Sequence, residues 1–241
     1  MKLLLLLFKS VKFGKILLTG GTMLISMFAY GLVFGWPYAV GFVLLIFVHE
    51  MGHYIAARQR GLNVGAPTFI PFVGAWINLK DLPHDVETEA YVGLAGPVVG
   101  TLGALGCYFA AREYSSPLLL ALSYSGFFLN LINLIPISPL DGGRVTAVIS
   151  PKMWLLGVPI LVGLFFVRPS PVLILIAILA VPQVMKAWRF DPSSPENRDY
   201  YAVSMEHKVT YGAAYIGLAA FLAVMSHDVH QMIEGAGQPG M

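Results

Sequence analysis

Apolar runs of about twenty residues alternate with short polar segments along most of the chain. Runs of this length are typical of helices that cross a bilayer, whose hydrocarbon core is about 30 Å thick. Seven candidate spans lie near residues 15–34, 36–57, 89–111, 116–135, 152–167, 171–188 and 208–227. The fifth is short and is joined tightly to the sixth, so these two could form a hairpin that crosses only part of the membrane. We predict an all-α membrane protein, a polytopic bundle of six to seven transmembrane helices.

Three further segments do not fit the pattern of a span. Residues 65–80 are apolar but are interrupted by Pro67, Pro71 and Gly74, which predicts a short extended or β-hairpin segment. Residues 1–14 carry several lysines and predict a basic segment at the membrane surface, with a surface strand as the alternative. We expect residues 15–227 to form a single transmembrane domain and residues 228–241 to form a flexible tail.

The composition agrees with a membrane protein. The chain is 57% hydrophobic and 12% charged, whereas soluble domains are about 45–50% apolar and about 25% charged. The net charge of +2 is too small to indicate nucleic acid as a partner. Cys107 is the single cysteine, so an intrachain disulfide is excluded.

The distribution of lysine and arginine predicts the orientation. If the N-terminus is cytoplasmic, thirteen of the fifteen basic residues fall on the inner side, and Arg112 and Arg168 fall outside. The positive-inside rule therefore favours a multi-pass protein with a cytoplasmic N-terminus. The domain-free build leads us to expect the plasma membrane of a prokaryote.

The second predicted span carries the motif His49-Glu50-Met51-Gly52-His53. Helix positions i and i+4 share a face, so His49 and His53 can hold one metal ion, and Glu50 can reach a water on that ion. Charged residues in a membrane are costly and usually functional, so a chance match is the weaker interpretation here.

Two histidines leave a catalytic zinc ion short of a ligand, because such ions usually have three protein ligands and one water. Most other carboxylates fall in loops. Asp141 differs, because Pro136 and Pro139 break the fourth span just before it and Gly142-Gly143 follow it. This arrangement predicts a carboxylate beside the end of the second span.

Together, His-Glu-x-x-His and the later Asn133-x-x-Pro-x-x-Pro-Leu-Asp141-Gly-Gly resemble the site-2 protease family of intramembrane zinc metalloproteases, peptidase family M50. The resemblance covers roughly residues 35–150, the expected catalytic core. It implies one zinc ion held by His49, His53 and Asp141, Glu50 as the catalytic base, and Asn133 near the bound substrate.

The expected function is therefore hydrolysis of peptide bonds in or near the transmembrane segments of substrate proteins, within the lipid bilayer. A helical substrate would have to unwind, and the 65–80 segment could pair with the unwound strand. A hairpin that only plugs the bundle is an equally good interpretation of that segment.

Two alternatives remain from the sequence. One is a membrane zinc protease that cuts loops or tails at the cytosolic face, although such enzymes usually take a third ligand from a glutamate on a later helix. The other is a non-catalytic metal-binding scaffold or transporter. A transporter needs a polar path, and the last three predicted spans contain no carboxylate.

Overall fold

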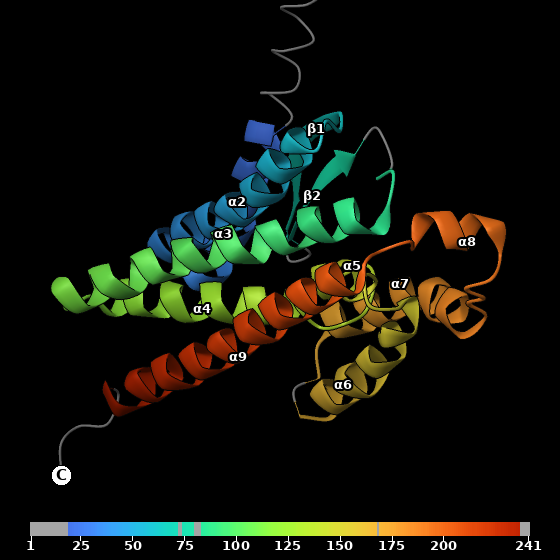
Figure 1. Cartoon of the computed structure of the whole chain (residues 1–241). Coiled ribbons are helices and arrows are strands. Elements are labelled where there is room, and N and C mark those ends of the chain that lie inside the picture. Colours follow the sequence, from blue (N-terminus) through green and yellow to red (C-terminus); the bar gives the residue numbers. More distant parts are fainter. Residues whose placement is uncertain (1–18, 72–73, 80–82, 168, 237–241) are drawn as a thin grey trace, which may run out of the picture.

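The computed structural model describes residues 19–71, 74–79, 83–167 and 169–236 (Figure 1). A first apolar helix, Thr19–Phe34, precedes the labelled elements. These are α2 (Trp36–Gln59), β1 (Val64–Ile70), β2 (Gly74–Leu79), α3 (Val86–Glu113), α4 (Pro117–Asn133), α5 (Asp141–Thr146), the 3-10 turn η1 (Pro151–Met153), α6 (Trp154–Val167), α7 (Pro171–Trp188), α8 (Pro195–Tyr200) and α9 (Met205–Ala236). Residues 1–14, predicted as a surface segment, lie outside the described part.

Local chemistry sets where several helices begin. The Asp85 carboxylate accepts a hydrogen bond from the Thr88 backbone N–H, which caps α3. Ser116 and Ser170 cap α4 and α7 in the same way, and a proline follows each serine at the first helical position. Proline suits that position because its missing N–H would have no partner within the helix.

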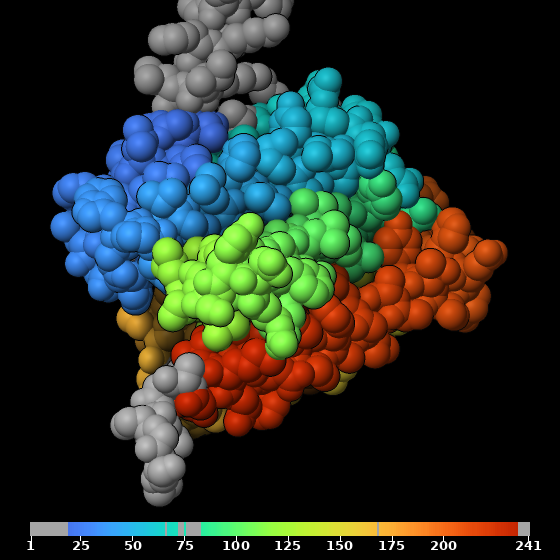
Figure 2. All heavy atoms as spheres, turned by 90° about the vertical axis from the view of Figure 1, so that its left-hand side faces the viewer, coloured from blue at the N-terminus to red at the C-terminus, as the bar shows by residue number. Residues whose placement is uncertain are grey.

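Helices α2, α3 and α4 pack closely because glycines remove side chains at their contacts. A Cβ at Gly52 of α2 would overlap the Ala95 carbonyl oxygen of α3. A Cβ at Gly126 of α4 would lie 2.8 Å from the Ala104 Cβ of α3. Figure 2 shows α3 between the N-terminal helices and α9, which packs on α4. These glycines of α2 and α4 therefore let both helices approach α3 closely.

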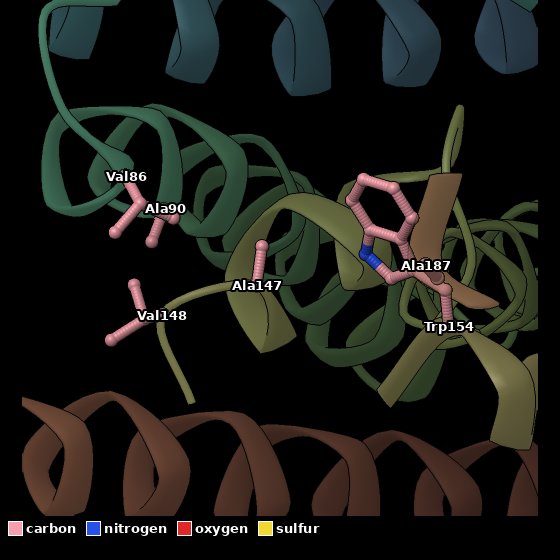
Figure 3. Packing of buried hydrophobic residues seen from close by; sticks show 6 residues of the cluster. All are labelled: Val86, Ala90, Ala147, Val148, Trp154 and Ala187. Carbon is pink, nitrogen blue, oxygen red and sulfur yellow. The ribbon is translucent and has the colours of Figure 1, made fainter. Parts of the chain in front are cut away.

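The short helix α5 is held against the chain that leads into it. A Cβ at Gly142 would overlap the Leu134 carbonyl oxygen, and one at Gly143 would overlap the Ser138 backbone nitrogen. The Trp154 indole N–H donates to the Gly143 carbonyl oxygen at 2.7 Å. Figure 3 shows the apolar cluster that fixes this region to α3 and α7, made of Val86, Ala90, Ala147, Val148, Trp154 and Ala187. The backbone position of Asp141 follows from this packing.

Strands β1 and β2 form a two-stranded antiparallel sheet, with an irregular register between Val64 and Pro67. The sheet lies against α2, and Phe69 is buried in a cluster with residues of that helix. The extended segment predicted over residues 65–80 is therefore a β-hairpin in its described part.

The predicted all-α membrane fold is confirmed. Within the described residues, α2, α3, α7 and α9 are long and apolar enough to cross a bilayer, and three shorter apolar helices accompany them. With 14 residues, α6 spans only about 21 Å, so it is shorter than the hydrocarbon core, as its sequence indicated.

The prediction of a tail from residue 228 was wrong in its boundary, because α9 continues to Ala236. Buried Val229 packs with Phe127 of α4 and extends the helix.

We expect Gly52→Ala to destabilise the protein, because the added methyl group forces α2 away from the α3 backbone. Overpacking of this kind costs about 1–3 kcal/mol. Gly217→Ala on α9, where the methyl group meets no atom within 4 Å, is the matched control. Denaturation in mixed detergent micelles would measure both variants. Equal stability of the two variants would contradict the close α2–α3 contact.

Candidate metal centre

The two histidines of α2 face the same way, as their i, i+4 spacing predicts. Their rings lie nearly perpendicular, and the His49 Nε2 and His53 Nε2 atoms are 3.1 Å apart. Both residues are buried, with exposed fractions of 4% and 7%. They lie ten and six residues before the end of α2 at Gln59, so about 9–15 Å along the helix from that end.

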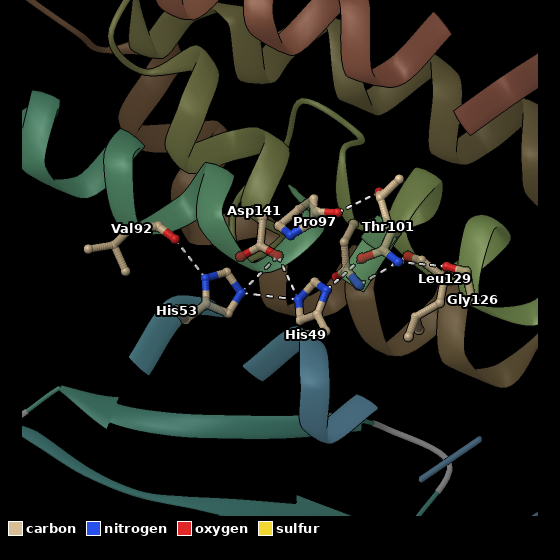
Figure 4. A network of polar contacts seen from close by, with 10 residues as sticks. His49, His53, Val92, Pro97, Thr101, Gly126, Leu129 and Asp141 are labelled. Atoms are coloured by element: carbon tan, nitrogen blue, oxygen red, sulfur yellow. Dashed lines mark hydrogen bonds and ion pairs between the residues drawn. The ribbon is translucent and has the colours of Figure 1, made fainter. Parts of the chain in front are cut away.

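Asp141, the first residue of α5, completes a three-residue cluster (Figure 4). Its Oδ2 atom lies 3.2 Å from His49 Nε2 and 3.2 Å from His53 Nε2. The structure therefore brings together the three residues for which the sequence predicted ligation, although Asp141 lies far from the histidines along the chain.

The outer nitrogen of each histidine is fixed as a hydrogen-bond donor. His53 Nδ1 lies 2.7 Å from the Val92 carbonyl oxygen, which can only accept. His49 Nδ1 lies 2.7 Å from Asn130 Oδ1. The Asn130 amide is oriented by its own Nδ2, which donates to the Gly126 carbonyl oxygen at 2.7 Å. Both Nδ1 atoms are therefore assigned a proton, and in the neutral form of each ring the lone pair of Nε2 points into the cluster.

Three acceptor atoms thus face one another, and this arrangement fits a cation. Asp141 Oδ2 is fully enclosed and has no hydrogen-bond partner among the residues that the structure describes, which is costly unless a positive charge satisfies it. A tetrahedral zinc ion with bonds of about 2.0–2.1 Å separates its ligand atoms by about 3.3 Å. The three distances of 3.1–3.2 Å match that spacing.

Glu50 occupies a different place from Asp141. A carboxylate oxygen of Glu50 and one nitrogen of each histidine lie within 4.8 Å of one another, so Glu50 could also join a metal group. Asp141 is closer to both histidines and fits better as the third ligand. Glu50 is 7% exposed, and its carboxylate makes no hydrogen bond to any residue that the structure describes.

Two glycines of α3 leave room for this cluster. A Cβ at Gly96 would overlap the His53 ring, and a Cβ at Gly100 would overlap the Asn130 amide. The α3 surface therefore lies directly against the His53 ring and the Asn130 amide and restricts the movement of both.

Asn130 and Asn133 of α4 have different surroundings. Asn130 is 2% exposed and contacts His49. Asn133, the predicted substrate residue, is half-buried, and its Nδ2 donates to the Leu129 carbonyl oxygen of its own helix at 3.1 Å. Sequence reasoning missed Asn130, and the available signal was a second amide three residues before Asn133 in an apolar span.

Comparison with known proteins gives a family match and several relatives. Residues 37–118 match the family model of peptidase family M50. A zinc metalloprotease of Methanocaldococcus jannaschii is 32% identical over 125 residues, which cover 48% of this chain and 36% of that protein. A chloroplastic "probable zinc metalloprotease" of Arabidopsis thaliana is 33% identical over 69 residues, 27% of this chain and 13% of its own length. The chain thus spans about a third or less of the length of these curated relatives.

The solved structure of a site-2 protease from Methanocaldococcus jannaschii is also similar, with 23% identity and a TM-score of 0.47 over 71% of this chain and 88% of that chain. The family match and the zinc metalloprotease relatives agree with the resemblance carried by the motifs around His49 and Asp141. These matches support the site-2 protease family of zinc metalloproteases as the family that the chain resembles.

Proposed function

We propose that this protein is an intramembrane zinc metalloprotease that hydrolyses peptide bonds in or near transmembrane segments of other proteins. The observation that carries the proposal is the cluster of His49, His53 and Asp141, whose acceptor atoms converge inside a bundle of apolar helices. The zinc metalloprotease relatives support the choice of metal.

His49 Nε2, His53 Nε2 and Asp141 Oδ2 would hold the zinc ion and leave one position open, as catalytic zinc sites do. When bound, zinc lowers the pKa of a coordinated water to about 7 and polarises a substrate carbonyl. Asn130 and the Val92 carbonyl oxygen position the two rings, because each accepts the proton of an Nδ1 atom.

Glu50 is suited to move protons. Its carboxylate is near the histidine nitrogens, has no hydrogen-bond partner among the described residues and is not needed as a ligand. It can accept a proton from the attacking water and return it to the leaving amine of the cut peptide bond.

Asn133 remains our proposed substrate-binding residue. Its amide uses one N–H within α4, so its second N–H and its Oδ1 are free for a peptide backbone or a developing oxyanion. The Asn130 amide, in contrast, is occupied at both Oδ1 and Nδ2. The two residues thus have the environments expected of a substrate contact and of a positioning residue.

A transmembrane helix must unwind before it is cut, because its backbone groups are hydrogen-bonded to one another. The β1–β2 sheet offers an edge for the unwound strand, but only on one side. On β1, Phe69 N–H donates to Thr22 Oγ1 at 3.1 Å and the Pro67 carbonyl oxygen accepts from Thr19 Oγ1 at 2.6 Å. We therefore propose that substrate pairs with the edge of β2.

The alternative functions are less well supported. A protease that cuts loops at the cytosolic face would not need its catalytic residues inside an apolar helix, about 9–15 Å from the end of that helix. A scaffold that only binds metal would have no use for the uncoordinated carboxylate of Glu50.

We also propose that the N-terminus and the His53 end of α2 face the cytoplasm of a prokaryotic cell. Basic residues lie at the ends of α2 and α7 on that side: Arg58 and Arg60 at the end of α2, and Lys186 and Arg189 at the end of α7. This placement agrees with the positive-inside rule.

The first test separates metal binding from catalysis. Glu50→Gln should keep about one zinc per chain and lose cleavage of a single-span model substrate, because it loses the base and not a ligand. Asp141→Asn should lower both zinc content and cleavage. Zinc analysis of purified protein and sequencing of new substrate termini measure the two effects. Cleavage by Glu50→Gln would reject Glu50 as base, and full zinc in Asp141→Asn would reject Asp141 as ligand.

The second test concerns the positioning of His49. We expect Asn130→Ala to lower zinc affinity about 10–100-fold, because the ring loses the partner that fixes its orientation. Asn133→Ala, on the same helix, should keep the affinity of the wild type and lose cleavage. Competition with a chelator of known affinity measures zinc binding. Equal zinc affinities of the two variants would contradict the assignment of Asn130.

The third test concerns orientation. In a background with Cys107→Ser, a membrane-impermeant maleimide added to intact cells should label Glu113→Cys and leave Ser193→Cys unlabelled. Both positions are exposed. Glu113 is the last residue of α3 and Ser193 follows α7, and the proposed topology puts them on opposite sides of the membrane. Labelling of Ser193→Cys from outside, with Glu113→Cys protected, would reverse the proposed topology.

A further inference from the structure

A cavity of about 440 Å³ lies away from the metal centre, among three segments that are distant in sequence. Its walls come from residues 147–152 after α5, from residues 190–202 around α8, and from Lys208 near the start of α9. The cavity is large enough for a phosphate-bearing headgroup, and no part of the proposed catalytic function uses it.

The charges on its walls have one sign. Lys152, Arg198 and Lys208 line the cavity, and no carboxylate is among its lining residues. Within the described part of the chain, none of the three forms an ion pair within 4.0 Å. Three cations that share one cavity without a carboxylate partner favour an anionic ligand.

Asp191, which lies between two lining residues in the sequence, is an anion that already has hydrogen-bond partners. Asp191 Oδ1 accepts hydrogen bonds from the Ser193 backbone N–H at 2.8 Å and from the Ser193 hydroxyl at 2.6 Å. These bonds, with a smaller contribution from Lys152, hold the pKa of Asp191 below its usual value. Asp191 therefore stays ionised beside the cavity but does not line it.

Neutral donors accompany the cations. The Ser150 hydroxyl oxygen accepts from the Lys152 backbone N–H at 3.2 Å, which leaves its O–H free to donate. Burial, together with the charge of Glu89, raises the pKa of Tyr201 to about 12, so its hydroxyl remains a donor at neutral pH. Hydroxyl donors beside lysine and arginine suit the several acceptor oxygens of a phosphate group.

The cavity lies at the level expected for lipid headgroups. Residues 190–202 directly follow α7, whose last residue, Trp188, is 78% exposed. Exposed tryptophan at the end of an apolar helix is typical of the membrane–water interface. Lys152 precedes the apolar helix α6, and Lys208 lies in the first turn of α9.

We propose that this cavity binds the phosphate headgroup of an anionic phospholipid, with Lys152, Arg198 and Lys208 as the charged contacts. Bound lipid would connect the segment after α5 to the segments around α8 and α9.

The test compares two double variants of equal charge change in the full-length chain. Lys152→Gln/Arg198→Gln removes one lysine and one arginine from the cavity. Lys186→Gln/Arg189→Gln removes the same pair from the end of α7, outside the cavity. Binding of phosphatidylglycerol to purified protein in detergent micelles is measured at fixed salt, with phosphatidylcholine for comparison.

The cavity variant should bind phosphatidylglycerol about 25-fold more weakly than wild type, because each lysine or arginine near an anionic lipid contributes about fivefold. The α7 variant should bind as wild type does, and phosphatidylcholine should bind more weakly throughout. Equal losses in both variants, or no preference for phosphatidylglycerol, would overturn the proposal. Displacement of the lipid by millimolar inorganic phosphate would assign the cavity to a soluble anion instead.

Discussion

The structure depends on three electron-pair donors held within 3.2 Å of one another in an apolar interior. When both imidazoles are neutral, this arrangement is unfavourable without a cation, because the lone pairs repel and water cannot reach the enclosed oxygen. The packing of the surrounding helices holds the three residues together against this repulsion. Gly96 keeps the α3 surface out of the space of His53, and the packing of Gly142 fixes the start of α5. A metal ion held by these three residues would therefore link α2 to α5, which are far apart in sequence.

The sequence predicted the parts of this centre that depend on local spacing or on a contiguous motif. The i, i+4 histidines share a face on any α-helix, and the broken helix before Asp141 is evident from Pro136 and Pro139. Asn130 and Asn133 could not be told apart, because each is an amide in an apolar helix and only tertiary packing decides which of them meets His49. The end of α9 was misjudged for a similar reason. Its glycine-rich sequence favours fraying, but contact of Val229 with α4 overrides that local preference.

The helices differ in how much of their apolar surface the protein itself covers. The most apolar windows of α2 and α3 are 50% and 39% buried, whereas those of α7 and α9 are 11% buried. A soluble protein would not leave helices as apolar as these uncovered. Lipid is therefore their solvent, and the two histidines of the centre lie on α2, the most covered of these four helices.

The two carboxylates near the histidines lie at different distances from them, and this difference supports different roles for the two groups. Asp141 lies 3.2 Å from both Nε2 atoms and is enclosed, so in the proposed centre its charge would be committed to the metal. Glu50 is held within 4.8 Å of the histidines by the rigid helix that also carries them. At that distance it can reach a water on the open side of the ion without displacing a ligand. If Glu50 were one position further along α2, the helical rotation of about 100° per residue would turn it away from the cluster. The spacing of Glu50 from the histidines is therefore as necessary to the proposed chemistry as the spacing between the histidines themselves.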